Sequence, residues 1–188
     1  MKRTAEYWIK QLRLRPHPEG GYYRETYRSP EIIAMADLPK RYKGRRSFAT
    51  AIYFLLRGNQ ISAFHRLKSN EIWHFYDGSP ISIFVIGKDG HLTTAKLGLN
   101  AVEGEQPQFV IKAGSWFAAR LVKQNPKSKI QNTQPRAGPP VAEKSYALIG
   151  CTVTPGFDFA DFEMGKRSEL CRQFPCHCAL IEQLTLKR

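Results

Sequence analysis

The chain has 188 residues, of which 42% are hydrophobic and 12% aromatic. That length supports one domain with a substantial core and leaves too little chain for two. No apolar run approaches the ~20 residues of a membrane span, and no apolar signal core follows the charged start Met1–Arg3. We therefore expect a single cytoplasmic domain over residues 1–188, with no membrane partner.

The formal net charge is +13, which excludes a strongly acidic protein and raises the question of anionic partners. Five of the seven residues from Lys40 to Arg46 are basic, and the block 122–144 adds further lysines and arginines. Such charge attracts nucleic acid or acidic ligands without specificity. We interpret it as a solvated surface and keep a nucleic-acid partner as the alternative.

The four cysteines are too few for a secreted disulfide framework, so we expect reduced thiols. They are Cys151, Cys171, Cys176 and Cys178. The segment Cys171-x4-Cys176-His177-Cys178 has some character of a zinc site. Its first spacing is longer than a CxxC knuckle and a fourth ligand is missing, so structural or incidental thiols are the preferred interpretation.

Taken in order, the chain begins with a short helix capped by Thr4 and extending to Leu14, since its apolar residues are spaced for one face. Pro16 and Pro18 end this helix. An extended run from Tyr22 to Tyr27 follows the pair Gly20-Gly21. Its residues alternate between two rows, and the sequence leaves open which row lines a pocket.

Ser47 to Leu56 is a predicted strand with near-continuous hydrophobicity. A strand exposed to solvent on one side would alternate more cleanly, so we expect this one to be buried on both faces. A second layer of the domain or a partner subunit would cover it.

Two further β-type runs, Ile61–Leu67 and Glu71–Tyr76, flank a polar turn. Alternation in the second run places Glu71, Trp73 and Phe75 on one face and His74 on the other. If His65 of the first run and Glu71 face the same interior, a base and a carboxylate lie among apolar and aromatic walls. That composition is typical of a small-molecule pocket.

Many short strands separated by glycine turns predict a sandwich or barrel for the rest of the chain rather than βαβ units. The remaining predicted strands are Ile81–Ile86, His91–Leu97, Phe109–Ile111, Trp116–Leu121 and Tyr146–Val153. The proline-rich block 122–144 is predicted to be an inserted surface loop. Lys166–Phe174 is predicted to be a helix, and Ala179–Leu186 is an apolar segment of undetermined type.

Gly58, His65, Glu71 and Gly78 resemble the first sequence motif of the cupin superfamily, in which histidines and a glutamate bind a metal. Leu67 stands where that motif has its second histidine. The string Lys112-Ala113-Gly114-Ser115-Trp116-Phe117 loosely resembles the second cupin motif, with Phe117 in place of its histidine ligand. The usual cupin metal ligands are therefore incomplete.

A narrower resemblance extends over nearly the whole chain outside the block 122–144. It rests on HPEGGYYRETYRS (17–29), TAIYFLL (50–56), SAFHRLKSNEIWHFYDGSP (62–80), AGSWFAARL (113–121) and GCTVTPGFDFADFE (150–163). These strings are similar to one small, largely uncharacterised cupin family, whose members resemble the dTDP-sugar epimerase type of jelly roll. The resemblance implies an all-β, double-stranded β-helix (jelly roll, cupin) with short N- and C-terminal helices. It also implies a homodimer.

His65 is the main candidate for a general base or a metal ligand, because histidine exchanges protons near neutral pH. Glu71 could orient His65, hold it charged, or act as an acid if burial raises its pKa. His74 is out of register with Glu71 and is the weaker candidate. The residues expected to bind a substrate are Tyr23, Tyr53, Trp73, His74, Phe75 and Trp116.

A metal, if one is bound, would be held by His65 and Glu71, but a metal site needs three or four ligands. The preferred function is a metal-free isomerase or epimerase acting on a small molecule, such as a sugar or nucleotide-sugar. In the sugar epimerases that this chain resembles, a histidine with a carboxylate partner removes a proton beside a carbonyl. A metal-dependent cupin oxygenase and a non-enzymatic ligand- or nucleic-acid-binding protein are the alternatives. No phosphate-binding glycine loop, serine nucleophile elbow or HExxH motif is present.

Overall fold

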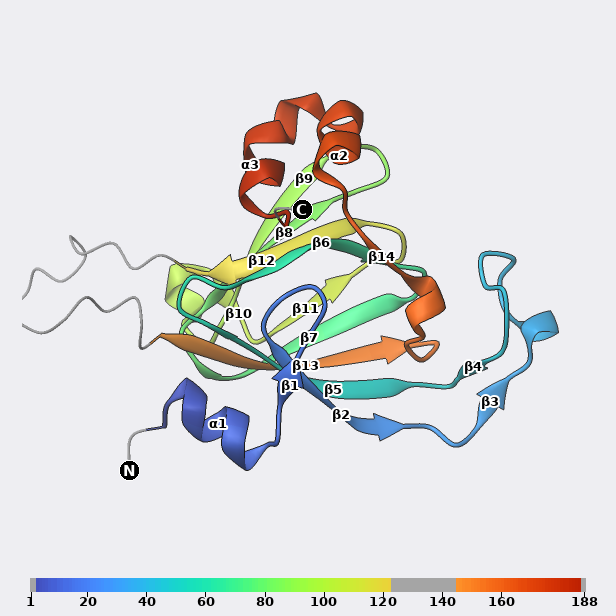
Figure 1. The fold of residues 1–188 in the computed structure, drawn as a ribbon, viewed down its shortest axis with the longest axis horizontal. Helices are drawn as coiled ribbons and strands as arrows, with labels where there is room; N and C mark the ends of the chain where they lie inside the picture. The colour runs from blue at the N-terminus through green and yellow to red at the C-terminus, as the bar shows by residue number, and fades with distance from the viewer. Residues whose placement is uncertain (1–2, 123–144, 187–188) are drawn as a thin grey trace, which may run out of the picture.

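The computed structural model describes residues 3–122 and 145–186. Two six-stranded sheets face each other and form the predicted double-stranded β-helix (Figure 1). The first sheet has the order β1-β2-β5-β13-β7-β11 and the second has the order β10-β9-β8-β12-β6-β14. Every pair of neighbouring strands is antiparallel except β9 and β10.

The strands of the first sheet are β1 (Arg15–Pro16), β2 (Tyr22–Arg28), β5 (Thr50–Arg57), β7 (Asn70–Gly78), β11 (Gln108–Ile111) and β13 (Tyr146–Thr154). Those of the second sheet are β6 (Ile61–Leu67), β8 (Ile81–Ile86), β9 (Leu92–Leu97), β10 (Glu105–Gln106), β12 (Trp116–Leu121) and β14 (Phe162–Met164). A separate hairpin of β3 (Ile32–Ile33) and β4 (Arg46–Ser47) projects beside the first sheet (Figure 1). The predicted strand Ser47–Leu56 is therefore divided between β4 and β5.

The main hydrophobic core lies between the two sheets and follows from the alternation of side chains along each strand. The first sheet contributes Phe54 and Trp73, and the second contributes Ile83 and Phe117, each with at most 1% of its surface exposed. This core fills only part of the space between the sheets.

Short helices cover the outer faces of both sheets. Helix α1 (Ala5–Gln11), capped by the Thr4 side chain, packs on Leu55 and Leu148 of the first sheet. This contact explains the two-sided burial predicted for the strand that contains Leu55. On the second sheet, Leu170 of α2 (Arg167–Gln173) and Ile181 of α3 (Cys178–Gln183) form a second core. The segment of undetermined type is thus largely α3.

The expectation of reduced thiols is wrong for two of the four cysteines, because Cys171 and Cys178 form a disulfide. Helices α2 and α3 meet side by side, and their approach brings the two Cα atoms to 4.6 Å, within the range a disulfide spans. Cys151 is a buried free thiol and Cys176 is an exposed one.

Two other expectations about surfaces are resolved in part. Of the predicted inserted loop, only Val122 belongs to the described residues. Within the basic run Lys40–Arg46, Arg46 is buried and ion-paired with Asp161, so this residue is not available to an anionic partner. Among the described helices, none has the length and apolar character needed to cross a membrane.

Candidate functional site

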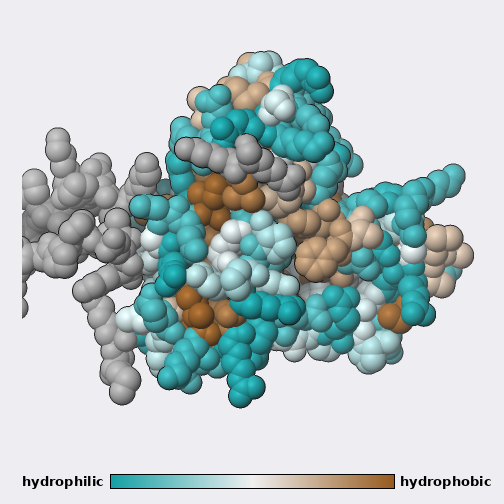
Figure 2. Space-filling model, in the orientation of Figure 1, coloured by the Kyte–Doolittle hydropathy of each residue, from teal (hydrophilic) through white to brown (hydrophobic). Residues whose placement is uncertain are grey.

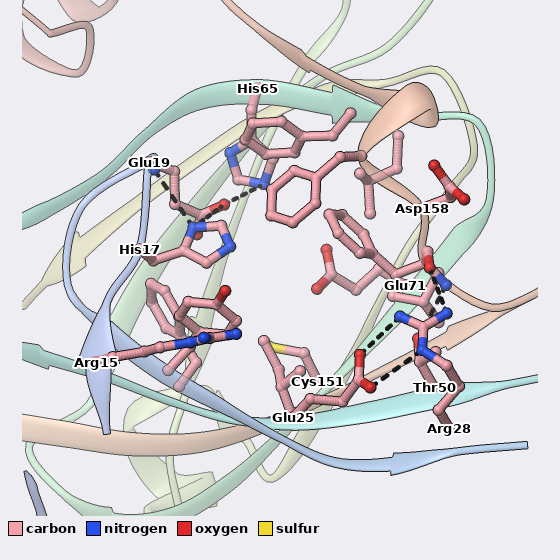
Figure 3. Close-up of a pocket in the computed structure, with 18 residues that line it drawn as sticks. Arg15, His17, Glu19, Glu25, Arg28, Thr50, His65, Glu71, Cys151 and Asp158 are labelled. Carbon is pink, nitrogen blue, oxygen red and sulfur yellow. Dashed lines mark hydrogen bonds and ion pairs between the residues drawn. The ribbon is translucent and has the colours of Figure 1, made fainter. Parts of the chain in front are cut away.

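A cavity of about 410 Å³ opens between the two sheets where the main core ends (Figure 3). Its volume lies in the range of small-molecule sites. Its polar lining consists of Arg15, His17, Glu19, Tyr23, Glu25, Arg28, Thr50, His65, Glu71, Cys151 and Asp158. Its apolar lining consists of Ile52, Phe54, Leu67, Val153, Phe157, Phe159 and Phe162.

The turn from residue 17 to residue 21 delivers His17 and Glu19 to this cavity. Gly20 and Gly21 both have positive φ, at 110° and 70°, which glycine adopts without strain. A Cβ on Gly20 would collide with the backbone carbonyl of Ile61, so the turn approaches β6 more closely than a side chain allows. The amide of Ala63 in β6 donates to the Glu19 carbonyl at 2.9 Å and fixes the turn there.

Glu19 is the carboxylate partner of His65. The Nε2 atom of His65 lies 3.1 Å from Glu19 Oε2, and the Ser62 hydroxyl donates to Glu19 Oε1 at 2.8 Å. On its other side, His65 Nδ1 lies 2.7 Å from the carbonyl oxygen of Ala63, which can only accept. His65 therefore carries a proton on Nδ1, and one further proton lies between Nε2 and Glu19.

Burial decides which member of this pair holds the shared proton. His65 and Glu19 are 2% and 5% exposed. Burial lowers the pKa of His65 to about 3, although the hydrogen bond to the Ala63 carbonyl raises this pKa in part. Burial and the nearby charge of Glu71 raise the pKa of Glu19 well above its usual value, although Ser62 lowers it in part. The pair is therefore a neutral carboxylic acid that donates to a neutral imidazole.

Glu71 enters the same cavity from β7. It is 7% exposed, and its buried Oε2 atom has no hydrogen-bond partner among the residues that the structure describes. Burial raises the pKa of Glu71 to about 7, and the neighbouring Trp73 and Cys151 side chains lower it in part. Glu71 therefore changes its protonation state near neutral pH. Its carboxyl points into the cavity interior from the side opposite the Glu19–His65 pair (Figure 3).

His17 lies beside the Glu19–His65 pair. The backbone amide of Glu19 donates to His17 Nδ1 at 3.3 Å, and Glu19 Oε2 lies 3.4 Å from the same nitrogen. Burial lowers the pKa of His17 to about 4, so the ring is neutral at neutral pH. Its edge-to-face contact with Tyr23, with centroids 4.5 Å apart, holds the ring in place.

Charged residues and an aromatic segment surround the mouth of the cavity. Arg28 makes two short hydrogen bonds to the Glu25 carboxylate and a third to the carbonyl of Phe157. The 3-10 helix η5 (Phe159–Asp161) leads into β14 and places Phe159, 55% exposed, at this edge. Over η5 and β14 the molecular surface is hydrophobic among polar surroundings (Figure 2).

The structure brings together three of the residues predicted for the site, which are His65, Glu71 and Tyr23. The predicted pairing of Glu71 with His65 is corrected, since the contact of His65 is with Glu19. The roles assigned to these side chains stay predictions.

The other five predicted substrate-binding residues do not line the cavity. Trp73 and Phe75 face the main core, further along β7 than Glu71. Tyr53 and His74 lie on the outer face of the first sheet, where Tyr53 contacts Tyr76 and His74 approaches Thr152. Trp116 packs under the C-terminal helices on the outer face of the second sheet. The aromatic wall is supplied instead by Phe54, Phe157, Phe159 and Phe162.

The side chains present do not fit the metal set of the cupin motif. Leu67 lines the cavity but has no atom that could bind a metal. Phe117 occupies the position of the motif's histidine ligand, and its ring centre lies 4.0 Å from that of His65. Both nitrogens of His65 are already engaged, by Ala63 and by Glu19. We therefore derive no chemistry through such a metal.

Sequence reasoning missed His17, Glu19 and Cys151. A signal for the first two was present, since the segment His17-Pro18-Glu19 directly precedes the glycine pair Gly20-Gly21. Two adjacent glycines mark a backbone that approaches another segment closely. Cys151 carried no local signal, because its neighbours are those of any buried strand.

Comparisons with known proteins agree with this fold. The family described as Cupin superfamily (DUF985) matches residues 6–165. The uncharacterized protein YML079W of Saccharomyces cerevisiae is 30% identical over an alignment of 159 residues, and the alignment covers 81% of this chain and 71% of the yeast protein.

Two solved structures are similar over the whole fold. Protein SO0799 from Shewanella oneidensis has a TM-score of 0.79 and 35% identity, with all of both chains covered. A hypothetical protein from Leishmania major has a TM-score of 0.83 and 32% identity, covering 98% of this chain and 100% of that one. The extent of the family match, together with the jelly-roll topology described above, shows that this chain belongs to the DUF985 family of the cupin superfamily.

Proposed function

We propose that this protein is an isomerase or epimerase that moves a proton on a small polar molecule such as a sugar. Glu71 acts as the general base, and the Glu19–His65 pair supplies a proton from the other side of the cavity. The proposal rests chiefly on the buried, unpartnered Oε2 of Glu71, which points into a cavity of ligand size.

The protonation states support this division of roles. A general base works best when its pKa lies near the working pH, as the pKa of about 7 for Glu71 does. The Glu19–His65 pair stays protonated over the same range, because burial holds the pKa of Glu19 high. One group is thus able to accept a proton while the other is able to donate one.

The reaction balances without an oxidant. Glu71 removes a proton from a carbon next to a carbonyl, the C–H electron pair forms a carbon–carbon double bond, and the carbonyl π pair moves onto oxygen. For inversion, the Glu19 proton adds to the opposite face of the same carbon, and exchange with water restores both carboxyl groups. For isomerisation of a hydroxycarbonyl compound, the proton held by Glu71 adds to the former carbonyl carbon, while the hydroxyl proton of the first carbon moves to the other oxygen. The aromatic wall of Phe54, Phe157, Phe159 and Phe162 keeps the apolar faces of the ligand out of water.

The test uses exchange with heavy water. The wild-type protein is incubated in D₂O with a metabolite extract, and mass spectrometry follows which compounds gain one deuterium. We expect at least one compound to exchange with the wild type and none with Glu71→Gln. The control is Glu163→Gln, which removes an exposed carboxylate outside the cavity. A wild-type protein that binds metabolites but exchanges none of them is a binding protein and not an isomerase.

A further inference from the structure

We propose that the ligand of this cavity carries both an anionic group, which Arg15 binds, and a carbonyl oxygen, which accepts a hydrogen bond from His17. The inference rests on the proposed function and specifies its substrate class: hydroxycarbonyl compounds that bear a phosphate or a carboxylate. Neither Arg15 nor His17 has a role in the proton transfer described above.

Arg15 is a cation without an acidic partner at the cavity. It lies on the edge strand β1, opposite Tyr23 of β2, and its guanidinium lies 5.0 Å from the centre of the Tyr23 ring. No carboxylate in residues 3–122 and 145–186 lies within ion-pair distance of it. Figure 3 shows its guanidinium on the same side of the cavity as His17.

The other arginine of the cavity differs in this respect. Glu25 neutralises Arg28 through two hydrogen bonds of 3.0 and 2.7 Å, and the Phe157 carbonyl takes a third. Within the described part of the chain, no side chain or carbonyl takes a hydrogen bond from the Arg15 guanidinium, so its N–H donors face a ligand. A guanidinium binds phosphate and carboxylate oxygens in pairs, so an anion is the ligand group that its geometry favours.

His17 presents a single hydrogen-bond donor to the ligand. Because its Nδ1 accepts from the Glu19 amide, the neutral ring carries its hydrogen on Nε2. Figure 3 shows that second nitrogen turned to the cavity interior, toward the side from which Glu71 enters. The rings of Tyr23, Phe54 and Phe162 surround His17 at 4.5 to 6.0 Å and prevent it from rotating away.

A neutral imidazole N–H is suited to a carbonyl oxygen that gains charge. As Glu71 removes the neighbouring proton, the electron pair moves onto that oxygen, and the N–H of His17 stabilises the enolate. A hydrogen bond of fixed direction costs no reorganisation at that moment, unlike one from water. His17 would therefore contact the reacting atoms, while Arg15 would position the ligand.

Four compounds test the ligand class, because they share one carbon skeleton. Glucose 6-phosphate and glucuronate carry an anion and open from their ring forms to a free aldehyde, glucose opens likewise but lacks the anion, and sorbitol 6-phosphate has no carbonyl in any form. Binding of each to the full chain is measured by titration calorimetry. The variants are Arg15→Gln, His17→Gln and, as a matched control, Arg24→Gln. Arg24 adjoins Tyr23 in β2 but does not line the cavity.

We expect the wild type to bind at least one charged sugar about tenfold more tightly than glucose, since a charge-assisted hydrogen bond contributes at least that factor. Arg15→Gln should abolish this preference and Arg24→Gln should keep it. His17→Gln should weaken the binding of glucose 6-phosphate more than the binding of sorbitol 6-phosphate. The better of the two charged sugars identifies the anion as phosphate or carboxylate.

Two results would overturn the inference. One is the absence of a preference for charge, seen either as equal binding of glucose and both charged sugars or as no binding of either charged sugar at millimolar concentration. The other is an equal effect of Arg15→Gln and Arg24→Gln. Failure of the proposed reaction looks different: charged sugars bind in an Arg15-dependent way, yet no compound of the extract exchanges deuterium. Conversely, Glu71-dependent exchange that Arg15→Gln leaves unchanged keeps the reaction and removes the ligand class.

Discussion

Glu71 shows how a single buried side chain links the stability of this fold to its chemistry. Its carboxyl has lost water and gained no hydrogen bond at Oε2, so its charged form is unfavourable in the folded state. The same isolation raises its pKa from the usual 4.5 to about 7. A residue that served only stability would have a partner or would be apolar.

The first prediction concerns the pH dependence of Glu71→Gln. Above pH 4.5 the unfolded chain releases the proton that the folded chain keeps up to about pH 7, so wild-type stability falls as pH rises through this window. His65, with a pKa lowered to about 3, acts in the opposite direction between about 3 and 6.5, and it is present in both proteins. The glutamine cannot ionise, so the stability of the variant does not fall in this way as the pH rises.

For Glu71, the difference between a pKa of about 7 in the folded chain and 4.5 in the unfolded chain corresponds to about 3 kcal/mol of stability, and hence to several degrees in melting temperature. Glu71→Gln should therefore melt several degrees above the wild type at about pH 8.5 and close to it at about pH 5. Calorimetry at both pH values checks this. A constant offset between the two proteins across the pH range would contradict the burial argument.

At the scale of elements, the segment that contains η5 and β14 closes the cavity and is held by a buried ion pair. Arg46 of β4 donates to both oxygens of Asp161, at 2.6 and 2.7 Å, and Lys68 Nζ approaches the same carboxylate at 3.2 Å. Arg46 and Asp161 are 5% and 6% exposed. This contact couples the β3–β4 hairpin to the aromatic wall.

Removing one member of this pair should be costly, because the other charge stays buried. We expect Asp161→Ala to lower the free energy of unfolding by about 3–5 kcal/mol. The control Glu163→Gln breaks the exposed contact with Arg66 and should cost less than about 1 kcal/mol. Urea denaturation measures both. Equal losses in the two variants would show that Asp161 does not hold the segment.

The strands were largely predictable, and the site only in part. Ile61–Leu67 and Trp116–Leu121 begin and end where the sequence predicts, because their apolar runs have clear turn signals at both ends. His65 and Glu71, for which the sequence left a common interior as a condition, both line the cavity. These are local properties of short segments.

The features of the site that the sequence did not predict depend on contacts between distant parts of the chain. The position of Glu19 follows from the close approach of Gly20 to the carbonyl of Ile61. The glycine pair signals a close approach, but no local pattern encodes which segment is approached. The aromatic wall comes from residues 157–162, far in sequence from His65. Trp73, Phe75 and Trp116, which were expected to bind a substrate, do not line the cavity. Aromatic content does not reveal which part of a core a side chain fills.

At the scale of the whole molecule, α1 covers one end of the outer face of the first sheet, and no other helix of residues 3–122 and 145–186 packs there. The uncovered part exposes Tyr27, Tyr76 and Val110, with 51%, 50% and 48% of their surface accessible. Such a face is typical of protein–protein contacts. We expect it to be the interface of the homodimer that the resemblance implies.

Sedimentation velocity tests this expectation. The wild type should sediment as a dimer, and Tyr76→Glu should shift it to monomer, because a charge is then buried without a partner in the interface. The control Tyr7→Glu places the same charge on helix α1, at a residue 40% exposed. A monomeric wild type, or a dimer that tolerates Tyr76→Glu, would contradict the assignment.

The strand order of the first sheet has a consequence for how the protein is made. Strand β13 lies between β5 and β7, yet it is the last strand of that sheet to leave the ribosome. Until residues 146–154 have been synthesised, β5 and β7 each present an unpaired edge, the state in which nascent chains aggregate most readily. Cys151 and the wall over the cavity arrive at the same late stage, so Glu19 and Glu71 stay hydrated and ionised until then. Completion of the sheet and the rise in the pKa of both carboxyls are therefore a single late event in biosynthesis.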